Sequence, residues 1–123
     1  MKKNMSYIQA SILNELMKTY TMSDVGNQVV EELNDKDIEL SVYESHEDGV
    51  VFRKKKDGII TDDQMVKGFM KALRHLIHHS SLIDEINDNY EFEYDDKYIT
   101  EGYLSDILEI RRSGRLISVE IDL

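Results

Sequence analysis

The sequence predicts an α+β protein in which helices and antiparallel strands follow one another in blocks. Three observations predict this class. Apolar residues recur every three to four positions in the first and middle parts of the chain, as amphipathic helices require. They alternate with polar residues in the segments between and after, as half-buried strands require. The resulting order of helices, strands, helix and strands argues against a parallel doubly wound sheet.

A single domain over residues 1–123 is expected. A chain of this length buries about two thirds of its surface on folding, which is enough for one core. The sequence shows no internal repeat, no Pro- or Gly-rich linker and no low-complexity segment. A second domain is therefore not indicated.

The first third of the chain is predicted to form two helices. Apolar residues at three-to-four spacing make residues 5–20 an amphipathic helix with one buried stripe. Ser23 is predicted to cap a shorter second helix, because its hydroxyl can accept hydrogen bonds from the free amides of the first turn. The run Asn34-Asp35-Lys36-Asp37 is expected to end it, because its side chains bond locally to the backbone and favour a turn.

A β-hairpin is expected next, because the apolar period changes to two. A five-residue loop over Ser45–Gly49 pairs Val42 with Phe52 and Leu40 with Lys54, which gathers most apolar groups on one face. Other loop lengths break that match. The sequence therefore predicts both the loop and this register.

The middle of the chain is predicted to return to helix. A tight turn at 57–58 precedes a short third strand over 59–61. Thr61 and Gln64 have capping-box spacing, in which each side chain bonds the other residue's amide. An apolar stripe behind this box predicts a long helix over about 62–79, followed by one or two further helical turns.

The last third is predicted to contain strands. Tyr90–Tyr94 alternates aromatic with acidic residues and is expected to be a strand. Ser113-Gly114 lies between two alternating runs, and a two-residue turn there pairs Ile110 with Ile117 and places four apolar residues on one face. A C-terminal hairpin should therefore complete a small antiparallel sheet on which the long helix packs.

Charge is distributed unevenly along the chain. The formal net charge is −10, from fifteen basic and twenty-five acidic side chains. Residues 31–49 and 84–101 each sum to −7, and the second block holds eight carboxylates with Lys97 as its only cation. Clustering of this kind is self-repulsive, and a surface that only keeps a protein soluble does better with both signs interspersed. The clustering therefore favours a functional explanation.

The block 84–101 is the candidate partner-binding site. Alternate side chains of a strand stand about 6.7 Å apart, so its carboxylates would form a row of negative charge that can imitate phosphates. Tyrosines within the block offer rigid contact area and a hydroxyl that tolerates water. The candidate residues are Asp84, Glu85, Asp88, Tyr90, Glu91, Glu93, Tyr94, Asp95, Asp96, Tyr98 and Glu101. The competing interpretation is a solvated acidic face without a partner.

Two further charged clusters are given structural roles. Arg53–Lys56 is the opposite charge run, and it is expected to guard a strand edge or to neutralise Glu39 and Glu44 across the hairpin rather than to bind nucleic acid. His75, His78 and His79 are expected to complement the dipole at a helix C-terminus. A metal site at these histidines is the alternative, and zinc titration with a thermal melt tests it.

Composition excludes several classes of function. Net acidity disfavours direct binding to nucleic acid or to anionic membranes. Without cysteine there is no disulfide, thiolate metal site or cysteine nucleophile, which suits a reducing cytosol. The start of the chain, Met1–Met5, leads into no apolar run of signal-peptide length, so a cytoplasmic protein is expected. No nucleotide-binding glycine loop, nucleophile elbow or His-Glu-x-x-His motif is present, and no enzyme, cofactor or metal is predicted.

The segment Asn89-Tyr90-Glu91-Phe92-Glu93-Tyr94-Asp95-Asp96, in a short acidic chain without cysteine, is similar to the small inhibitors encoded by phages and mobile elements, including anti-CRISPR proteins and other DNA mimics. The resemblance is one of type and covers about twenty residues. It implies a non-catalytic inhibitor that occupies the basic DNA-reading groove of a nuclease or Cas effector. Two alternatives stay open. One is an immunity protein against a basic toxin nuclease; the other is a plain assembly subunit, such as a homodimer joined through the terminal hairpin or the first helix. A monomer is expected for the inhibitor.

Overall fold

The computed structural model describes residues 4–123 and confirms the α+β class. Its four strands form one antiparallel sheet in the order β1-β2-β4-β3. The expectation that the chain starts without a signal peptide was based on Met1–Met5. The first three of these residues lie outside the described part of the chain. The described elements are α1 (Met5–Thr19), α2 (Met22–Leu33), β1 (Leu40–His46), β2 (Gly49–Lys54), α3 (Asp62–His78), α4 (Leu82–Asn89), the 3-10 turn η1 (Asp96–Tyr98), α5 (Glu101–Ile107), β3 (Leu108–Ser113) and β4 (Leu116–Ile121).

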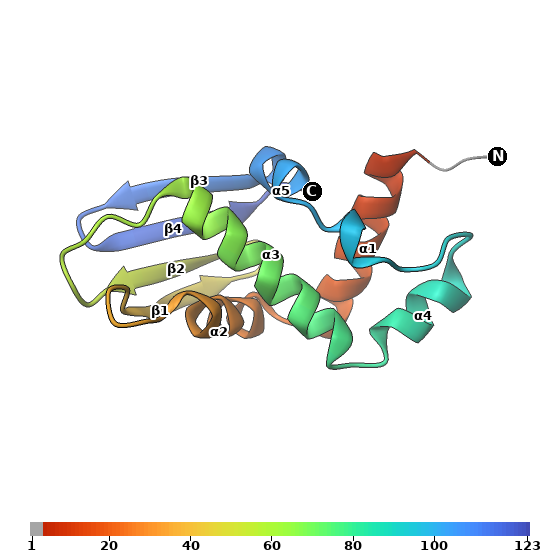
Figure 1. The fold of residues 1–123 in the computed structure, drawn as a ribbon, viewed down its shortest axis with the longest axis horizontal. Helices are drawn as coiled ribbons and strands as arrows, with labels where there is room; N and C mark the ends of the chain where they lie inside the picture. Colours follow the sequence, from red (N-terminus) through yellow and green to blue (C-terminus); the bar gives the residue numbers. More distant parts are fainter. Residues whose placement is uncertain (1–3) are drawn as a thin grey trace.

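The described helices cover one of the two faces of the sheet. Figure 1 shows α2 and α3 lying across that face, while α1 and α4 lie beyond one end of the strands. Buried apolar side chains fill the core between helices and sheet, and Phe52 of β2 meets Phe69 of α3 edge to face with ring centroids 6.1 Å apart. Alternate residues of the same strands, such as Val51 and Arg111, stay on the other face.

The predicted helices are confirmed with one change of cap. The expected segments 5–20 and 62–79 are observed as α1 and α3, and Thr61 and Gln64 form both bonds of the predicted capping box. The prediction that Ser23 caps the second helix is wrong. Thr21 is the cap, because its hydroxyl accepts from the Asp24 amide while the Asp24 carboxylate accepts from the Thr21 amide, and Ser23 lies inside the first turn.

The first hairpin has the predicted register and a different loop. Val42 pairs with Phe52 and Leu40 with Lys54, as expected. The predicted five-residue loop is wrong, since the strands continue to His46 and Gly49 and leave a two-residue turn. A β-bulge between Val42 and Glu44 shifts the register by one residue. The pairs Val42–Phe52 and Leu40–Lys54 are therefore the ones that a five-residue loop without a bulge would give.

The predicted third strand over 59–61 is not formed. β2 already has β1 on one side and β4 on the other, so no edge of β2 is left for a returning strand. The segment instead crosses toward β3, where the Arg112 guanidinium donates to the Ile60 carbonyl at 2.7 Å. The sheet is therefore closed by the C-terminal hairpin and not by a three-stranded meander.

The C-terminal hairpin is confirmed, with its turn one residue further along. Ile110 pairs with Val119 and not with the predicted Ile117. The turn residues are Gly114 and Arg115, and Gly114 has the positive φ of 58°. Glycine at the first central position satisfies a type II′ turn, whereas the predicted placement would put Ser113 at a position that favours positive φ. A shift of two pairing positions leaves each side chain on its expected face.

Candidate functional site

The outer face of α4 carries the first carboxylates of the candidate site. Leu82 and Ile86 are buried, and α4 packs on α1. Asp84 and Asp88 are one turn apart and therefore share the exposed side with Glu85 close by. Within the described residues no hydrogen bond or ion pair holds these three carboxylates. Asp84 and Glu85 also lie in the first helical turn, where negative charge complements the helix dipole.

The segment 90–95 is a loop that bends at residues 90–92, so the predicted strand over Tyr90–Tyr94 is wrong. Its position beyond the end of the sheet gives it no neighbouring strand to pair with (Figure 1). It is held by local bonds instead, and the Tyr94 amide donates to the Asn87 side-chain oxygen at 2.7 Å. The predicted alternation nevertheless holds: the aromatic residues are half-buried and the acidic residues Glu91, Glu93 and Asp95 are exposed.

An aromatic cluster lies beneath these acidic residues. The ring of Tyr90 stacks on Phe92 with centroids 5.5 Å apart, and Phe92 meets Tyr98 edge to face at 6.2 Å. The Tyr90 hydroxyl donates to Glu15 of α1 at 3.0 Å, and Gln9 of α1 donates to the Tyr98 carbonyl at 2.9 Å. The cluster therefore fastens the loop to α1, and its rings are half-buried whereas Glu91 and Glu93 are exposed.

Asp96 is turned toward the protein and not along the row. Its Oδ1 accepts from the Tyr94 hydroxyl at 2.8 Å and lies 2.7 Å from His78 Nε2 at the end of α3. Burial raises the pKa of Asp96, but the hydrogen bonds from Tyr94 and His78 together lower it by more, so the net pKa lies below its ordinary value. Burial, and then the bond to Asp96, raise the pKa of Tyr94. This network ties the loop to α3.

The last candidate residues belong to short local structures that the sequence did not predict. The Asp95 carboxylate accepts from the Lys97 amide and caps η1, with the Lys97 amino group 4.0 Å away. Glu101 begins α5, which Thr100 caps through the Tyr103 amide. Both caps are Asx or Thr motifs and are readable in the sequence at Asp95 and Thr100.

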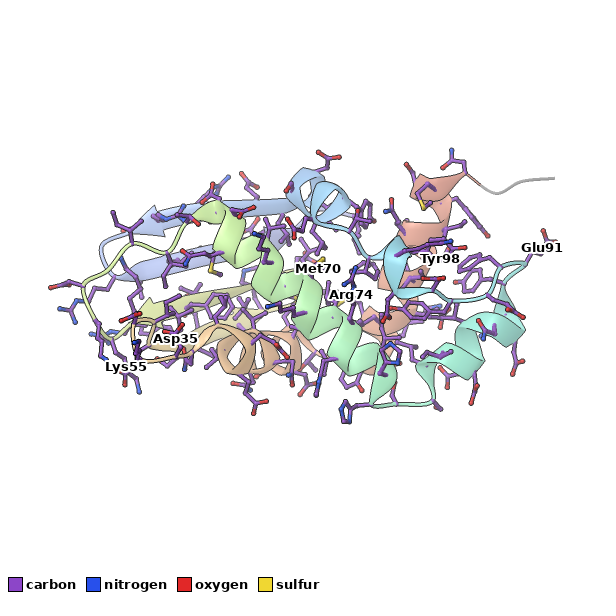
Figure 2. The ribbon with its side chains drawn as sticks, viewed as in Figure 1. Asp35, Lys55, Met70, Arg74, Glu91 and Tyr98 are labelled. Atoms are coloured by element: carbon purple, nitrogen blue, oxygen red, sulfur yellow. The ribbon has the colours of Figure 1, made fainter. Side chains whose placement is uncertain are left out.

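The structure thus brings most of the predicted site together at one end of the molecule. Figure 2 places Glu91 at this end and Lys55, from the basic run, at the opposite end. We call the exposed carboxylates here the acidic end; they are Asp84, Glu85, Asp88, Glu91, Glu93 and Asp95. Asp96 faces inward and Glu101 is half-buried at the start of α5, so these two stand apart.

The second acidic block, residues 31–49, is spread along the molecule. The Asp35 carboxylate accepts from the Asp37 and Ile38 amides, which lowers the pKa of Asp35. Glu39 lies 3.8 Å from the Lys56 amino group, so one of the two predicted neutralising contacts of the basic run forms. Glu44 pairs across the hairpin with Val51 instead of a cation.

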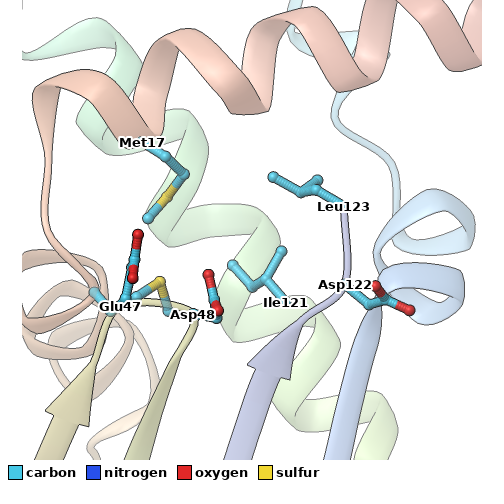
Figure 3. A pocket seen from close by; sticks show the side chains of 7 residues that line it. Met17, Glu47, Asp48, Ile121, Asp122 and Leu123 are labelled. Atoms are coloured by element: carbon cyan, nitrogen blue, oxygen red, sulfur yellow. The ribbon is translucent and has the colours of Figure 1, made fainter.

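A cleft that the sequence did not reveal lies between α1 and the strand ends. It has a volume of about 330 Å³, and Figure 3 shows Met17 above it with Glu47, Asp48 and Asp122 around it. Glu47 and Asp48 are the hairpin turn of β1 and β2, so only the correct loop length would have placed them here.

The histidines of α3 lie near the acidic end without forming a metal centre. The rings of His75 and His79 are 4.0 Å apart, and His78 contacts Asp96. Over residues 4–123 no three His, Asp or Glu side chains come together in a way that can hold a metal ion.

The described helices are all too short or too polar to cross a membrane. Comparison of the chain with protein-family models, with curated proteins and with solved structures finds no match.

Proposed function

We propose that this protein is a non-catalytic inhibitor whose acidic end binds the basic nucleic-acid-binding surface of a nuclease or Cas effector. The observation that carries the proposal is the outward set of carboxylates held over a packed aromatic cluster. A loop that is held in place before binding loses little conformational entropy when a partner's arginines and lysines meet its carboxylates. This preorganisation distinguishes the site from a flexible acidic tail.

The charge balance of the acidic end supports an electrostatic partner. Lys97 is the only cation within residues 84–101, and its amino group lies at the limit of contact with Asp95. Asp84, Glu85, Asp88 and Glu93 form no ion pair with any described residue. An unneutralised cluster of this size steers a basic partner toward it, and the attraction is screened over about 8 Å at physiological ionic strength. Binding should therefore be fast and weaken steeply with salt.

The test removes charge from the acidic end without touching its internal contacts. Glu85→Gln, Asp88→Asn and Glu93→Gln are combined, leaving Asp95 and Asp96 to their caps and hydrogen bonds. A matched control carries Glu31→Gln, Asp37→Asn and Glu47→Gln in the other acidic block, so the net charge changes by the same amount. Each immobilised protein is exposed to a bacterial lysate at low and high salt, captured proteins are identified, and their cleavage or binding of DNA is assayed.

The expected result is a captured nucleic-acid-binding protein that DNA displaces, that high salt releases and that the wild-type chain inhibits. The triple variant of the acidic end should lose capture and inhibition, while the control retains both. Equal loss in both variants would show that only net charge matters. Retained inhibition by the triple variant would place the contact on another face, and either result would reject the proposed site.

A further inference from the structure

The two edges of the sheet differ in how they are protected. The strands β1 and β3 each have one side without a neighbouring strand. The β1 edge is interrupted by the bulge between Val42 and Glu44, and a bulge is one of the devices that prevent edge pairing. β3 pairs with β4 in unbroken register over all six residues and contains no proline. Its outer backbone groups therefore form a regular template for another strand.

The side chains of β3 leave this edge accessible. Arg112, which lies on the helix-covered side, folds back onto the chain and contacts the Asp62 carboxylate and the Ile60 carbonyl. Glu109 and Arg111 lie on the open face of the sheet and pair with each other along the strand, with half or more of each side chain exposed. No described helix or loop donates to or accepts from the backbone of residues 109–113 on the outer side.

We propose that two copies of this chain associate through β3, pairing antiparallel about Ile110 to give one continuous eight-stranded sheet. In this register Glu109 of one copy lies directly opposite Arg111 of the other, and the reverse pair forms across the two-fold axis. Opposite charges directly across an antiparallel pair stabilise it, and like charges destabilise it. Residues on the same face of each copy then meet, so both helical layers lie on one side of the joint sheet.

Charge selects this register over its neighbours. Moving the two-fold axis to Arg111 sets two arginines opposite each other, and moving it to Glu109 sets two glutamates opposite each other. The pairing is isologous, as a closed dimer requires. The strand is short, so the dimer should be weak, in the class of interfaces below the standard size. The two acidic ends would lie at opposite ends of the dimer, and the inference does not depend on the proposed inhibitory function.

The test uses two charge-reversal variants, each of which should lose self-association alone and regain it when mixed with the other. Glu109→Arg sets arginines opposite arginines, Arg111→Glu sets glutamates opposite glutamates, and each should weaken self-association at least about tenfold. An equimolar mixture of the two variants restores opposite charges only between chains, because neither variant can form the pair within its own strand. Sedimentation over about 5–500 μM, a range suited to small interfaces, should show a dimer for wild type and for the mixture.

The matched control makes the same reversals on an exposed ion pair of α3, with Asp63→Lys and Lys67→Glu mixed. These variants should associate as wild type does. Because the chain has no cysteine, Ile110→Cys places the only thiol at the proposed axis and should oxidise to a covalent dimer, whereas Ser118→Cys on the interior strand β4 should not. A wild-type chain that stays monomeric over the whole concentration range, or a mixture no more dimeric than its components, would overturn the proposal.

Discussion

Replacing Gly26 by alanine tests a close approach between α2 and the sheet. Gly26 lies inside α2, and a Cβ built there would meet the Val50 Cγ2 at 2.7 Å and the Val42 Cγ2 at 3.2 Å. Val50 is fully buried in β2, and its side chain is branched at Cβ, so it has little freedom to move away. The backbone of α2 can therefore lie this close to β1 and β2 only because residue 26 has no side chain.

The expected cost is the difference between two opposing effects. Alanine in place of glycine favours a helix by about 1 kcal/mol. Overpacking a rigid core costs about 1–3 kcal/mol, because α2 must move or the valines must leave their rotamers. An approach of 2.7 Å to a side chain with little freedom belongs in the upper part of that range, about 2–3 kcal/mol. Gly26→Ala should thus destabilise the protein by about 1–2 kcal/mol, which corresponds to a fall of about 4–8 °C in Tm for a domain of this size.

Thermal unfolding followed by circular dichroism at pH 7 measures this effect, with Gly102→Ala as the control. Gly102 lies in α5, and a Cβ there meets nothing within 4 Å. The control should gain stability, by about 0.5–1 kcal/mol. A Gly26→Ala variant that melts at or above the wild-type temperature would refute the argument that contact with Val50 sets the position of α2.

Three further predictions concern local contacts. Phe92→Ala removes the ring that contacts both Tyr90 and Tyr98, and each aromatic pair contributes about 0.5–1.5 kcal/mol. Amide hydrogen exchange should therefore become faster over residues 90–98, while the amides of the sheet stay protected. Asp96→Asn should destabilise the protein at neutral pH. Since the pKa of Asp96 is lowered on folding, the carboxylate contributes its full stabilisation above the unfolded pKa of 3.8 and loses it as the pH falls below that value. The difference in free energy of unfolding between variant and wild type, measured in urea melts, should therefore disappear at low pH. Thr61→Ala removes one half of the α3 capping box and should cost about 1 kcal/mol in equilibrium unfolding, and an unchanged midpoint would contradict that role.

The sequence predicts which face of the sheet each side chain occupies better than it predicts the turns. The Val42–Phe52 pair follows from placing apolar residues on one face, which is a constraint that the folded sheet must also satisfy. The loop length does not follow, because a bulge can absorb one residue and produce the same pairing beyond it. The C-terminal turn at Gly114 differs for a related reason: a shift of two pairing positions leaves every side chain on its face, so hydrophobic pattern alone cannot distinguish the two.

The candidate site shows the same division between pattern and partner. Alternation over residues 90–95 predicts correctly which side chains face outward. Alternation alone is not enough to form the predicted strand, because a strand requires a neighbouring strand and the fold places this segment beyond the sheet against α1. The cleft at Glu47 and Asp48 was not predictable, since it depends on where α1 crosses the strand ends.

The fold also provides a reason to prefer one acidic block over the other. Residues 31–49 have the same net charge as residues 84–101, but they run along β1, whose seven residues span roughly 23 Å from the Asp35 turn to the Glu47 turn. Their charges are partly satisfied locally, by amides at Asp35 and by Lys56 at Glu39. The carboxylates of residues 84–95 instead belong to one short helix and the loop that follows it. Potentials from nearby charges add only within about a screening length, so the second arrangement produces the stronger local field. A basic groove should therefore bind the α4 end of this molecule in preference to its β1 side.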